Sequence, residues 1–231
     1  MNSPKIAVII PALNEEQSIG RVVADLPKDL VQWVIVADNG STDQTAVVAR
    51  EHGALVVSEP RRGYGSACMA GIAALPAEAE TVVFMDGDYS DHPAELRQLV
   101  SVIEQGADLV IGSRVLGQRE KGSLTPQQRC GNWLATQLIR LFYGFAYTDL
   151  GPFRAIGKQS LQALNMQDRN FGWTVEMQVK ALQNGLRVAE VPVSYRKRIG
   201  KSKVSGTIAG SVKAGIKILW TIGRLAVVGM R

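Results

Sequence analysis

The sequence predicts an α/β fold in which a mainly parallel central sheet is covered by helices on both faces. Short runs rich in β-branched residues recur at 6–10, 33–37, 54–57, 81–85 and 108–111. Segments with the periodicity of helices lie between these runs. Strands that alternate with helices favour a parallel sheet, because the helices connect successive strands and cover both faces.

The pattern of apolar and capping residues defines the elements in order. Segment 15–26 places Ile19, Val22 and Val23 on one stripe, which predicts a helix, and a shorter helix at 45–50 follows good capping residues at 41–43. The alternation weakens after about residue 115. The rest of the chain is expected to form an amphipathic helix at 128–142, an irregular loop at 147–154, helices near 160–165 and 173–184, and a strand at 188–195.

Composition limits the class of protein. A chain of 231 residues with 46% hydrophobic content fits one large domain that folds without disulfides. Cys68 and Cys130 lie in helical segments without metal-ligand spacing, so we expect buried free thiols. The apolar run at 6–10 is too short for a signal peptide, so we expect the chain to stay in the cytoplasm.

Positive charge is concentrated at the C-terminal end. Residues 196–231 hold nine of the 26 basic residues and no acid, whereas the remaining 17 are outnumbered by 21 acidic residues. This distribution predicts that the tail meets phosphates or an anionic membrane surface. Nucleic acid is not expected as a partner, because the basic residues form one loop and one helix without aromatic stacking pairs.

The acidic cluster at residues 86–91 is the sharpest chemical signal. Asp86 and Asp88 directly follow the core strand at 81–85, separated by one glycine. Two carboxylates at this spacing can face one cation, and oxygen ligands suit Mg²⁺ or Mn²⁺ carrying a diphosphate. The alternative is an acidic turn that caps a helix at Pro93, with Asp91 or His92 as the cap residue.

Polar loops also follow the other predicted strands, where ligands gather in parallel sheets. Asp38 can accept hydrogen bonds from a nucleobase or ribose, or simply form a turn, and Asn14 can cap a helix. The Gly63-Tyr64-Gly65 segment lacks the third glycine of a dinucleotide-binding fingerprint, which speaks against a Rossmann dehydrogenase. A phosphate contact from the basic pair at 61–62 remains open.

The ordered loops together resemble family 2 glycosyltransferases. The matching segments are 11–15 (Pro-Ala-Leu-Asn-Glu), 38–41 (Asp-Asn-Gly-Ser), 62–65 (Arg-Gly-Tyr-Gly), 86–88 (Asp-Gly-Asp) and 112–114 (Gly-Ser-Arg). Within that family the chain looks most like the dolichyl-phosphate or polyprenyl-phosphate mannosyl- and glucosyltransferases, over roughly residues 5–206. It lacks the Gln-x-x-Arg-Trp motif of processive synthases.

This resemblance implies a GT-A fold, a nucleotide-diphosphate sugar donor and an inverting reaction. It divides residues 1–206 into a donor half at 1–115 and an acceptor half at 116–206. Asp86 and Asp88 would hold the metal and the diphosphate. Where relatives usually have a second acid, Asn39 stands here, which leaves Asp38 as the candidate for binding the base. The implied donor-binding residues are Pro11, Leu13, Glu15, Asp38, Arg62, Asp86 and Arg114.

The acceptor side is implied by segments later in the chain. Residues 148–154 resemble the family's Thr-Asp…Phe-Arg segment, and residues 196–203 resemble its mobile Arg…Gly-x-Ser-Lys loop. Glu176 is either a base for a hydroxyl acceptor or an ion-pairing helix acid, and a phosphate acceptor needs no base. The implied catalytic residues are Asp88, Glu176, Arg154 and Lys203. The implied acceptor and diphosphate contacts are Arg129, Asp149, Arg196, Arg198, Ser202 and Lys203.

The segment 207–231 is predicted to form a basic amphipathic helix. Lys213, Lys217 and Arg224 interrupt its apolar run, so it fits a membrane interface better than a membrane span. Packing against the domain or a dimer partner is the alternative, and a homo-oligomer stays open.

The leading functional hypothesis is transfer of a hexose from a GDP-mannose or UDP-glucose type donor to polyprenyl or dolichyl phosphate, at the cytoplasmic face of a membrane. The same donor with a soluble or lipid hydroxyl acceptor is the alternative. A third hypothesis is a non-catalytic module that binds nucleotide sugars or membranes.

Overall fold

A computed structural model describes residues 4–200 and 208–229 of the chain. Its seven strands are β1 (Ile6–Ala12), β2 (Val31–Asp38), β3 (Leu55–Ser58), β4 (Thr81–Phe84), β5 (Leu109–Ser113), β6 (Arg154–Gly157) and β7 (Val188–Pro192). The helices are α1 (Ile19–Ala24), α2 (Thr45–Glu51), α3 (Tyr64–Ala73), the 3₁₀ helix η1 (Pro93–Glu95), α4 (Leu96–Glu104), α5 (Pro126–Tyr143), α6 (Lys158–Leu164), α7 (Trp173–Gln183) and α8 (Ile208–Gly229).

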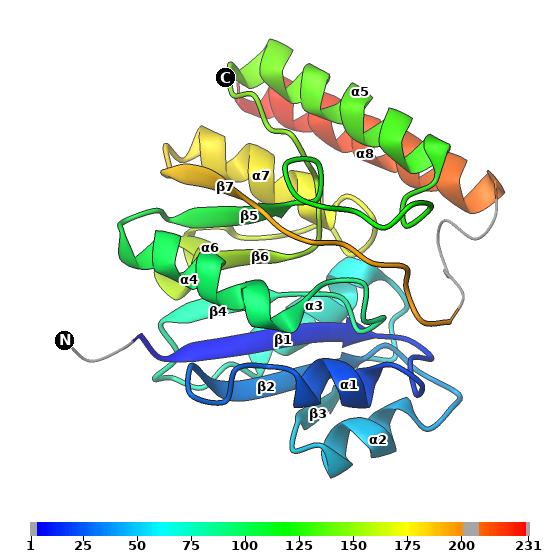
Figure 1. The fold of residues 1–231 in the computed structure, drawn as a ribbon. Coiled ribbons are helices and arrows are strands. Elements are labelled where there is room, and N and C mark those ends of the chain that lie inside the picture. Colours follow the sequence, from blue (N-terminus) through cyan, green and yellow to red (C-terminus); the bar gives the residue numbers. More distant parts are fainter. Residues whose placement is uncertain (1–3, 201–207, 230–231) are drawn as a thin grey trace.

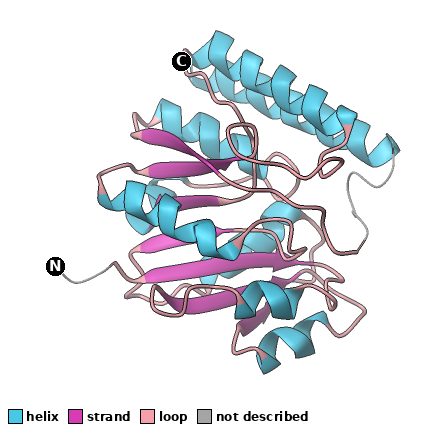
Figure 2. Ribbon diagram, in the orientation of Figure 1, coloured by secondary structure: helices cyan, strands magenta, loops and turns pink. Residues whose placement is uncertain are grey.

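The strands form one sheet in the order β3-β2-β1-β4-β6-β5-β7. All neighbouring pairs are parallel except those of β6, which is antiparallel to both β4 and β5. Helices lie in front of and behind the sheet (Figure 2). The predicted α/β fold with a mainly parallel sheet and helices on both faces is confirmed.

Alternation along the strands builds a separate core on each face. On β1, Val8 and Ile10 pack with α1 and α4, whereas Ile9 packs on the opposite face with α3 and α7. This follows from the two-residue period of a strand, which sends successive side chains to opposite faces. The parallel strands therefore read as continuous apolar runs, and their carboxyl ends all open onto one edge.

Strand β6 was not predicted, and it brings the second half of the chain into the sheet. It inserts between β4 and β5, where Arg154 lies opposite both Phe84 and Ile111. The predicted irregular loop therefore ends at 153, and the predicted strand at 188–195 ends at Pro192.

Helix α8 packs on the molecule along one side. Its Ile222 and Leu225 belong to the same core cluster as Trp173 of α7 and Ile139 of α5. Figure 1 shows α5 and α8 side by side at one end of the sheet. Within residues 4–200 and 208–229, no helix is long and apolar enough to cross a membrane.

Candidate active site

A cavity of about 300 Å³ lies at the carboxyl ends of the strands of the donor half. Its lining comes from the end of β1 and the loop after it, the start of α3, the loop after β4 and two residues that precede α7. The lining residues are Pro11, Ala12, Leu13, Glu15, Asn39, Arg62, Gly63, Tyr64, Ala67, Asp86, Gly87, Asp88, Asn170, Phe171 and Arg198. The structure therefore brings together Pro11, Leu13, Glu15, Arg62, Asp86 and Asp88 of the predicted donor-binding residues. Arg198, predicted among the acceptor and diphosphate contacts, lines the same cavity.

The turn after β4 fixes the position of Asp88. Tyr89 adopts a left-handed backbone conformation with φ of 63°, which folds Ser90 back toward Asp88. Oδ1 of Asp88 accepts hydrogen bonds from the backbone nitrogen of Ser90 at 2.9 Å and from its hydroxyl at 2.5 Å. The other oxygen, Oδ2, lies 3.1 Å from Nη2 of Arg198. One carboxylate oxygen of Asp88 is therefore held by the turn that carries it, and the other faces the guanidinium of Arg198.

Asp86 and Asp88 together favour a bound cation. Burial, followed by the nearby negative charge of Asp88, raises the pKa of Asp86 to about 7. Within the described residues, no group of three or more His, Cys, Asp or Glu side chains could hold a metal. Two carboxylates with oxygen-only chemistry still fit Mg²⁺ or Mn²⁺, provided that a ligand supplies further oxygens.

Arg198 bridges two acidic residues of the cavity. Its Nη2 lies 3.1 Å from Oε1 of Glu15 and 3.1 Å from Oδ2 of Asp88. The backbone nitrogen of Ile199 donates to the carbonyl of Asp88 at 2.9 Å. Nε of Arg198 is buried without a hydrogen-bond partner among the described residues. The guanidinium therefore holds a spare donor beside the Asp86–Asp88 pair.

Arg196 does not reach the cavity. Its guanidinium lies over the ring of Tyr89, 3.4 Å from the centroid, and Nη2 donates to the carbonyl of Asp91 at 3.1 Å. It ties the segment 194–199 to the turn after β4. Of the basic residues at 196–198, Arg198 is the one that lines the site. Ser202 and Lys203 lie outside the described residues.

Asn39, rather than Asp38, contributes to the cavity. The side-chain nitrogen of Asn39 donates to the carbonyls of Glu59 and Arg61 at 2.9 and 2.8 Å, and its oxygen accepts from the backbone nitrogen of Gly63 at 2.8 Å. An aspartate there could not donate. Asp38 is not a lining residue, and its carboxylate accepts from the backbone nitrogen of Ser41 at 3.2 Å. The prediction that Asp38 binds the base is not supported by this geometry.

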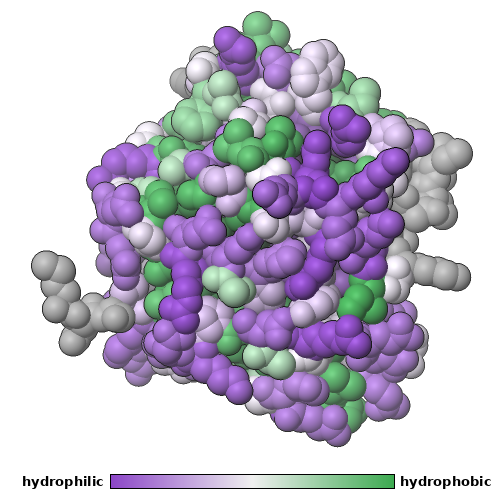
Figure 3. All heavy atoms as spheres, in the orientation of Figure 1, coloured by the Kyte–Doolittle hydropathy of each residue, from purple (hydrophilic) through white to green (hydrophobic). Residues whose placement is uncertain are grey.

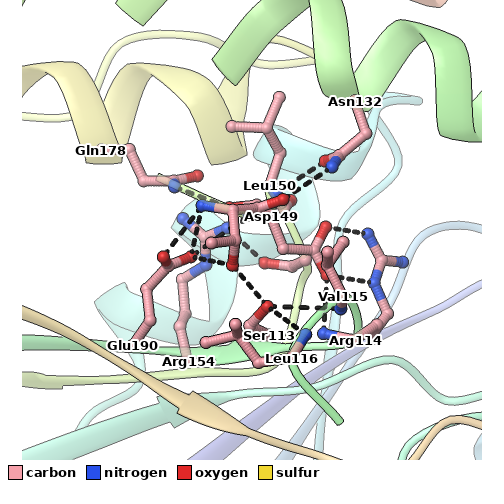
Figure 4. A network of polar contacts seen from close by, with 12 residues as sticks. Ser113, Arg114, Val115, Leu116, Asn132, Asp149, Leu150, Arg154, Gln178 and Glu190 are labelled. Carbon is pink, nitrogen blue, oxygen red and sulfur yellow. Dashed lines mark hydrogen bonds and ion pairs between the residues drawn. The ribbon is translucent and has the colours of Figure 1, made fainter. Parts of the chain in front are cut away.

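Arg114 and Asp149 form a buried pair beside the cavity rather than in it (Figure 4). Nε of Arg114 lies 2.8 Å from Oδ2 of Asp149, and Nη2 lies 2.7 Å from Oδ1. Burial alone would raise the pKa of Asp149, but the charge and hydrogen bonds of Arg114 outweigh it and lower the pKa. The pair anchors the loop 147–153 to the end of β5.

Arg154 is fully buried, which contradicts its predicted catalytic role. Its guanidinium donates to the carbonyl of Thr174 at 2.9 Å. It also donates to the carbonyl of Gly151, and Figure 4 shows Arg154 within this network. Burial lowers its pKa. Arg154 therefore joins the loop before β6 to the start of α7 and cannot touch a substrate in the cavity.

Glu176 is also a structural residue, so its predicted role as a base is wrong. It is 0% exposed. Its carboxylate accepts from the backbone nitrogens of Gln167 at 3.0 Å and Asp168 at 2.7 Å, and lies 2.8 Å from Nζ of Lys180. The alternative interpretation, an ion-pairing helix acid, is the one that the geometry supports.

A second cavity of about 670 Å³ lies beside α5. It is lined by Val115, Arg119, Leu124, Pro126, Arg129, Cys130, Asn132, Trp133, Thr136, Gln137, Ala146, Tyr147 and Thr148. Arg129, predicted on the acceptor side, faces this space. Cys130 is exposed, so the prediction that it is buried is wrong, whereas Cys68 is buried as expected.

A short segment connects the two cavities. Tyr195 forms an isolated backbone bridge with Arg119, which lines the second cavity. Arg198, three residues later, lines the first cavity. The segment 195–198 therefore borders both cavities.

Sequence reasoning missed several residues that shape the site. Tyr64, Asn170 and Phe171 line the first cavity. Asp91 is 1% exposed, and its Oδ1 has no partner among the described residues. Of the two cap residues considered above, His92 takes the N-cap position of η1, without a side-chain hydrogen bond, and Asp91 does not. The position of Tyr64 between two glycines was a usable signal. Asn170 and Phe171 had none, because the fold brings them from a distant loop.

Comparison with known proteins identifies relatives along nearly the whole chain. Residues 7–163 match the family model described as glycosyl transferase family 2. An uncharacterized glycosyltransferase of Mycobacterium tuberculosis is 40% identical over 216 residues, which are 93% of this chain and 96% of that protein. A dolichyl-phosphate hexose transferase of Haloferax volcanii is 32% identical over 218 residues, which are 93% of this chain and 92% of that protein.

A solved structure shares the fold. Glucosyl-3-phosphoglycerate synthase of Mycobacterium tuberculosis, in complex with Mn²⁺, UDP-glucose and phosphoglyceric acid, superposes with a TM-score of 0.74. It is 26% identical, and the match covers 95% of this chain and 80% of that one.

Proposed function

The chain belongs to glycosyl transferase family 2, and on that premise we propose that it transfers a hexose from a nucleoside diphosphate sugar to a polyprenyl phosphate. The observation that carries the proposal is the arrangement of Asp86, Asp88 and Arg198 around one cavity at the strand ends. The dolichyl-phosphate hexose transferase among its relatives supports the same branch of the family.

The donor would occupy the first cavity. Apolar side chains such as Pro11 and Leu13 can cover a nucleoside, and Asp86 and Asp88 belong to the polar part of the same lining. These two carboxylates would hold Mg²⁺ or Mn²⁺ together with diphosphate oxygens. When bound, the cation would neutralise charge that develops on the departing nucleoside diphosphate.

Arg198 would contact the diphosphate directly. It pairs with the carboxylates of Glu15 and Asp88. Its unpaired Nε supplies a donor for a phosphate oxygen, and guanidinium groups bind phosphates in a fixed, two-pronged geometry. Arg62 is an exposed second cation on the same lining. Cations at this position favour the leaving group without a proton transfer.

The acceptor would enter through the second cavity. Arg119 and Arg129 suit a phosphate, and Val115, Leu124 and Trp133 suit an apolar chain. A phosphate acceptor is already ionised, so it needs no general base, which agrees with the burial of Glu176. Direct attack of the phosphate on the sugar carbon inverts the configuration of that carbon.

The proposal includes a peripheral position on the cytoplasmic face of a membrane. Helix α5 exposes Trp133, Leu141 and Phe142, and α8 exposes Ile216 and Trp220. Figure 3 shows apolar residues among polar ones at the end of the molecule where these helices lie. Lys217 and Arg224 lie over the Trp220 ring at 4.6 and 5.1 Å, a combination suited to anionic headgroups.

A soluble phosphorylated acceptor is the second candidate. The solved synthase with the shared fold was crystallised with phosphoglyceric acid. The arginines of the second cavity would bind such a molecule by the same charge attraction.

Calorimetric titration tests the donor site. The wild-type protein with Mn²⁺ should bind GDP or UDP, and should bind the same nucleotide weakly after the metal is removed with EDTA. ADP is the matched control, because it carries the same diphosphate. If neither GDP nor UDP binds with Mn²⁺ present, or if ADP binds equally well, the donor assignment is wrong.

A further inference from the structure

The loop at residues 167–172 forms one wall of the first cavity, and it is packed directly against the start of α3. Asn170 and Phe171 of this loop line the cavity. A Cβ atom added to Gly63 or Gly65 would lie about 2 Å from the carbonyl oxygens of Arg169 and Asp168, respectively. The backbone nitrogen of Ser66 donates to the carbonyl of Arg169 at 3.0 Å. A shift of the 167–172 loop would therefore move both walls of the cavity.

Asp168 holds this loop in shape from within. Its Oδ1 accepts hydrogen bonds from the backbone nitrogens of Asn170 at 2.8 Å and Gly172 at 3.2 Å. Its own backbone nitrogen donates to Oε2 of Glu176 at 2.7 Å. The carboxylate is almost fully buried, and a buried charge requires a partner of opposite sign.

The partner of Asp168 comes from α8. Nζ of Lys217 lies 2.7 Å from Oδ2 of Asp168, and the exposed fractions of the two side chains are 34% and 2%. Nζ also lies 4.6 Å from the centre of the Trp220 ring. Helix α8 therefore supplies a charge to the cavity wall, although none of its described side chains lines the cavity.

We infer that Lys217 is a positioning residue for the donor cavity, which acts through Asp168 on the 167–172 loop. This inference rests on the proposed function of the cavity. If Lys217 has this role, α8 is part of the donor site. Removing the ammonium group leaves a buried carboxylate without its counter-charge, and the loop must then rearrange to hydrate it.

Nucleotide affinity tests the inference. With Mn²⁺ present, we expect Lys217→Met to weaken the binding of GDP or UDP about tenfold by calorimetry, and Lys217→Arg to restore most of it. Arg224→Gln is the matched control, since it removes a cation over the same Trp220 ring. The double variant Lys217→Met/Asp168→Asn should bind no more weakly than the weaker single variant, because both substitutions remove one interaction.

A second control separates positioning from loss of stability. Leu225→Ala removes a buried α8 side chain without touching the ion pair, so it should lower the melting temperature and leave nucleotide affinity unchanged. If Leu225→Ala weakens nucleotide binding as much as Lys217→Met does, or if Lys217→Met binds like the wild type, the inference is wrong.

Hydrogen exchange gives a readout that does not depend on any nucleotide. In Lys217→Met the amides of Asn170, Gly172 and Ser66 should exchange faster, while amides in the middle of β1 stay protected. Unchanged exchange at these three amides would contradict the inference that Lys217 positions the 167–172 loop. Failure of the wild type to bind either nucleotide would instead overturn the proposed donor function, and the exchange data would still decide whether Lys217 positions the loop.

Discussion

The two cavities hold their charged residues in different ways. In the first, Asp88 is fixed by Ser90 and Arg198, and Arg198 is fixed in turn by Glu15. In the second, Arg119 and Arg129 are exposed and form no ion pair with any residue that the structure describes. The first cavity is thus arranged in advance around one ligand geometry, whereas the second offers cations that an anionic ligand can recruit.

The difference follows from burial. Glu15 and Asp88 of the first cavity are largely removed from water, so each requires a partner of opposite charge before the ligand arrives. The arginines of the second cavity stay hydrated, so they need no partner and can adapt to acceptors of different size. Specificity for the donor and tolerance toward the acceptor are the functional consequences that we expect.

The largest effect should come from the buried Arg114–Asp149 ion pair. This pair holds the loop 147–153, which contributes Thr148 to the second cavity. Asp149→Asn leaves the Arg114 guanidinium without its counter-charge, which should lower the free energy of unfolding by about 3–5 kcal/mol. Urea unfolding followed by circular dichroism measures this loss. A loss of unfolding free energy below about 1 kcal/mol would mean that the Arg114–Asp149 pair does not hold the wall of the second cavity in place.

The next effect concerns the first cavity. Asp88→Asn should reduce transfer by about 10²- to 10³-fold, because it removes one of the two carboxylates proposed to hold the cation that would neutralise the departing nucleoside diphosphate. The exposed Asp25→Asn is the control, since Asp25 accepts from the Tyr89 hydroxyl outside the cavity lining. Steady-state rates at saturating acceptor give the comparison. Equal rates in the two variants would exclude Asp88 from the reaction.

The exposed arginines should show a smaller and more selective effect. Arg119→Gln combined with Arg129→Gln should raise the KM for a phosphate-bearing acceptor about 10- to 100-fold. Donor affinity should not change. Arg140→Gln removes an exposed cation elsewhere on α5 and should alter neither quantity. If the double variant lowers the affinity for the donor as much as the affinity for the acceptor, the two cavities do not have separate roles.

The smallest effect should appear at the membrane. Trp133→Ser with Trp220→Ser should reduce binding to phosphatidylglycerol-containing vesicles about three- to tenfold in a flotation assay. Val47→Ser replaces an exposed apolar residue on α2 and serves as the control. Vesicle binding that is unchanged by the tryptophan substitutions would leave α5 and α8 without a membrane role.

The sequence predicted the donor half well because local signals coincide there. The strands of that half end in polar residues, so Glu15, Asp86 and Asp88 could be placed on one rim before any coordinates were known. Asp38 and Asn39 show the limit of this reasoning. They follow the same strand, but the cavity is lined by Asn39, whose amide joins segments 20 to 24 residues away.

The acceptor half was predicted less well because its contacts are distant in sequence. Strand β6, Arg154–Gly157, holds a single β-branched residue, Ile156, so it lacks the apolar run that marks β3 and β4, and its partners β4 and β5 are distant in sequence. Without that strand, the sequence pattern places Arg154 in a loop near the substrate. Glu176 was misplaced for a different reason: its carboxylate is held by backbone nitrogens of Gln167 and Asp168, and no side-chain pattern in the sequence indicates a backbone contact.

Transfer to lipid is the most direct test of the central claim. The protein is incubated with Mn²⁺, polyprenyl phosphate and radiolabelled GDP-mannose or UDP-glucose, with phosphoglyceric acid as the competing acceptor, and the organic and aqueous phases are counted. We predict that wild-type protein moves label from one donor into the organic phase as an acid-labile lipid, and that Asp88→Asn does not. Label that stays in the aqueous phase on phosphoglyceric acid would contradict the lipid-phosphate assignment.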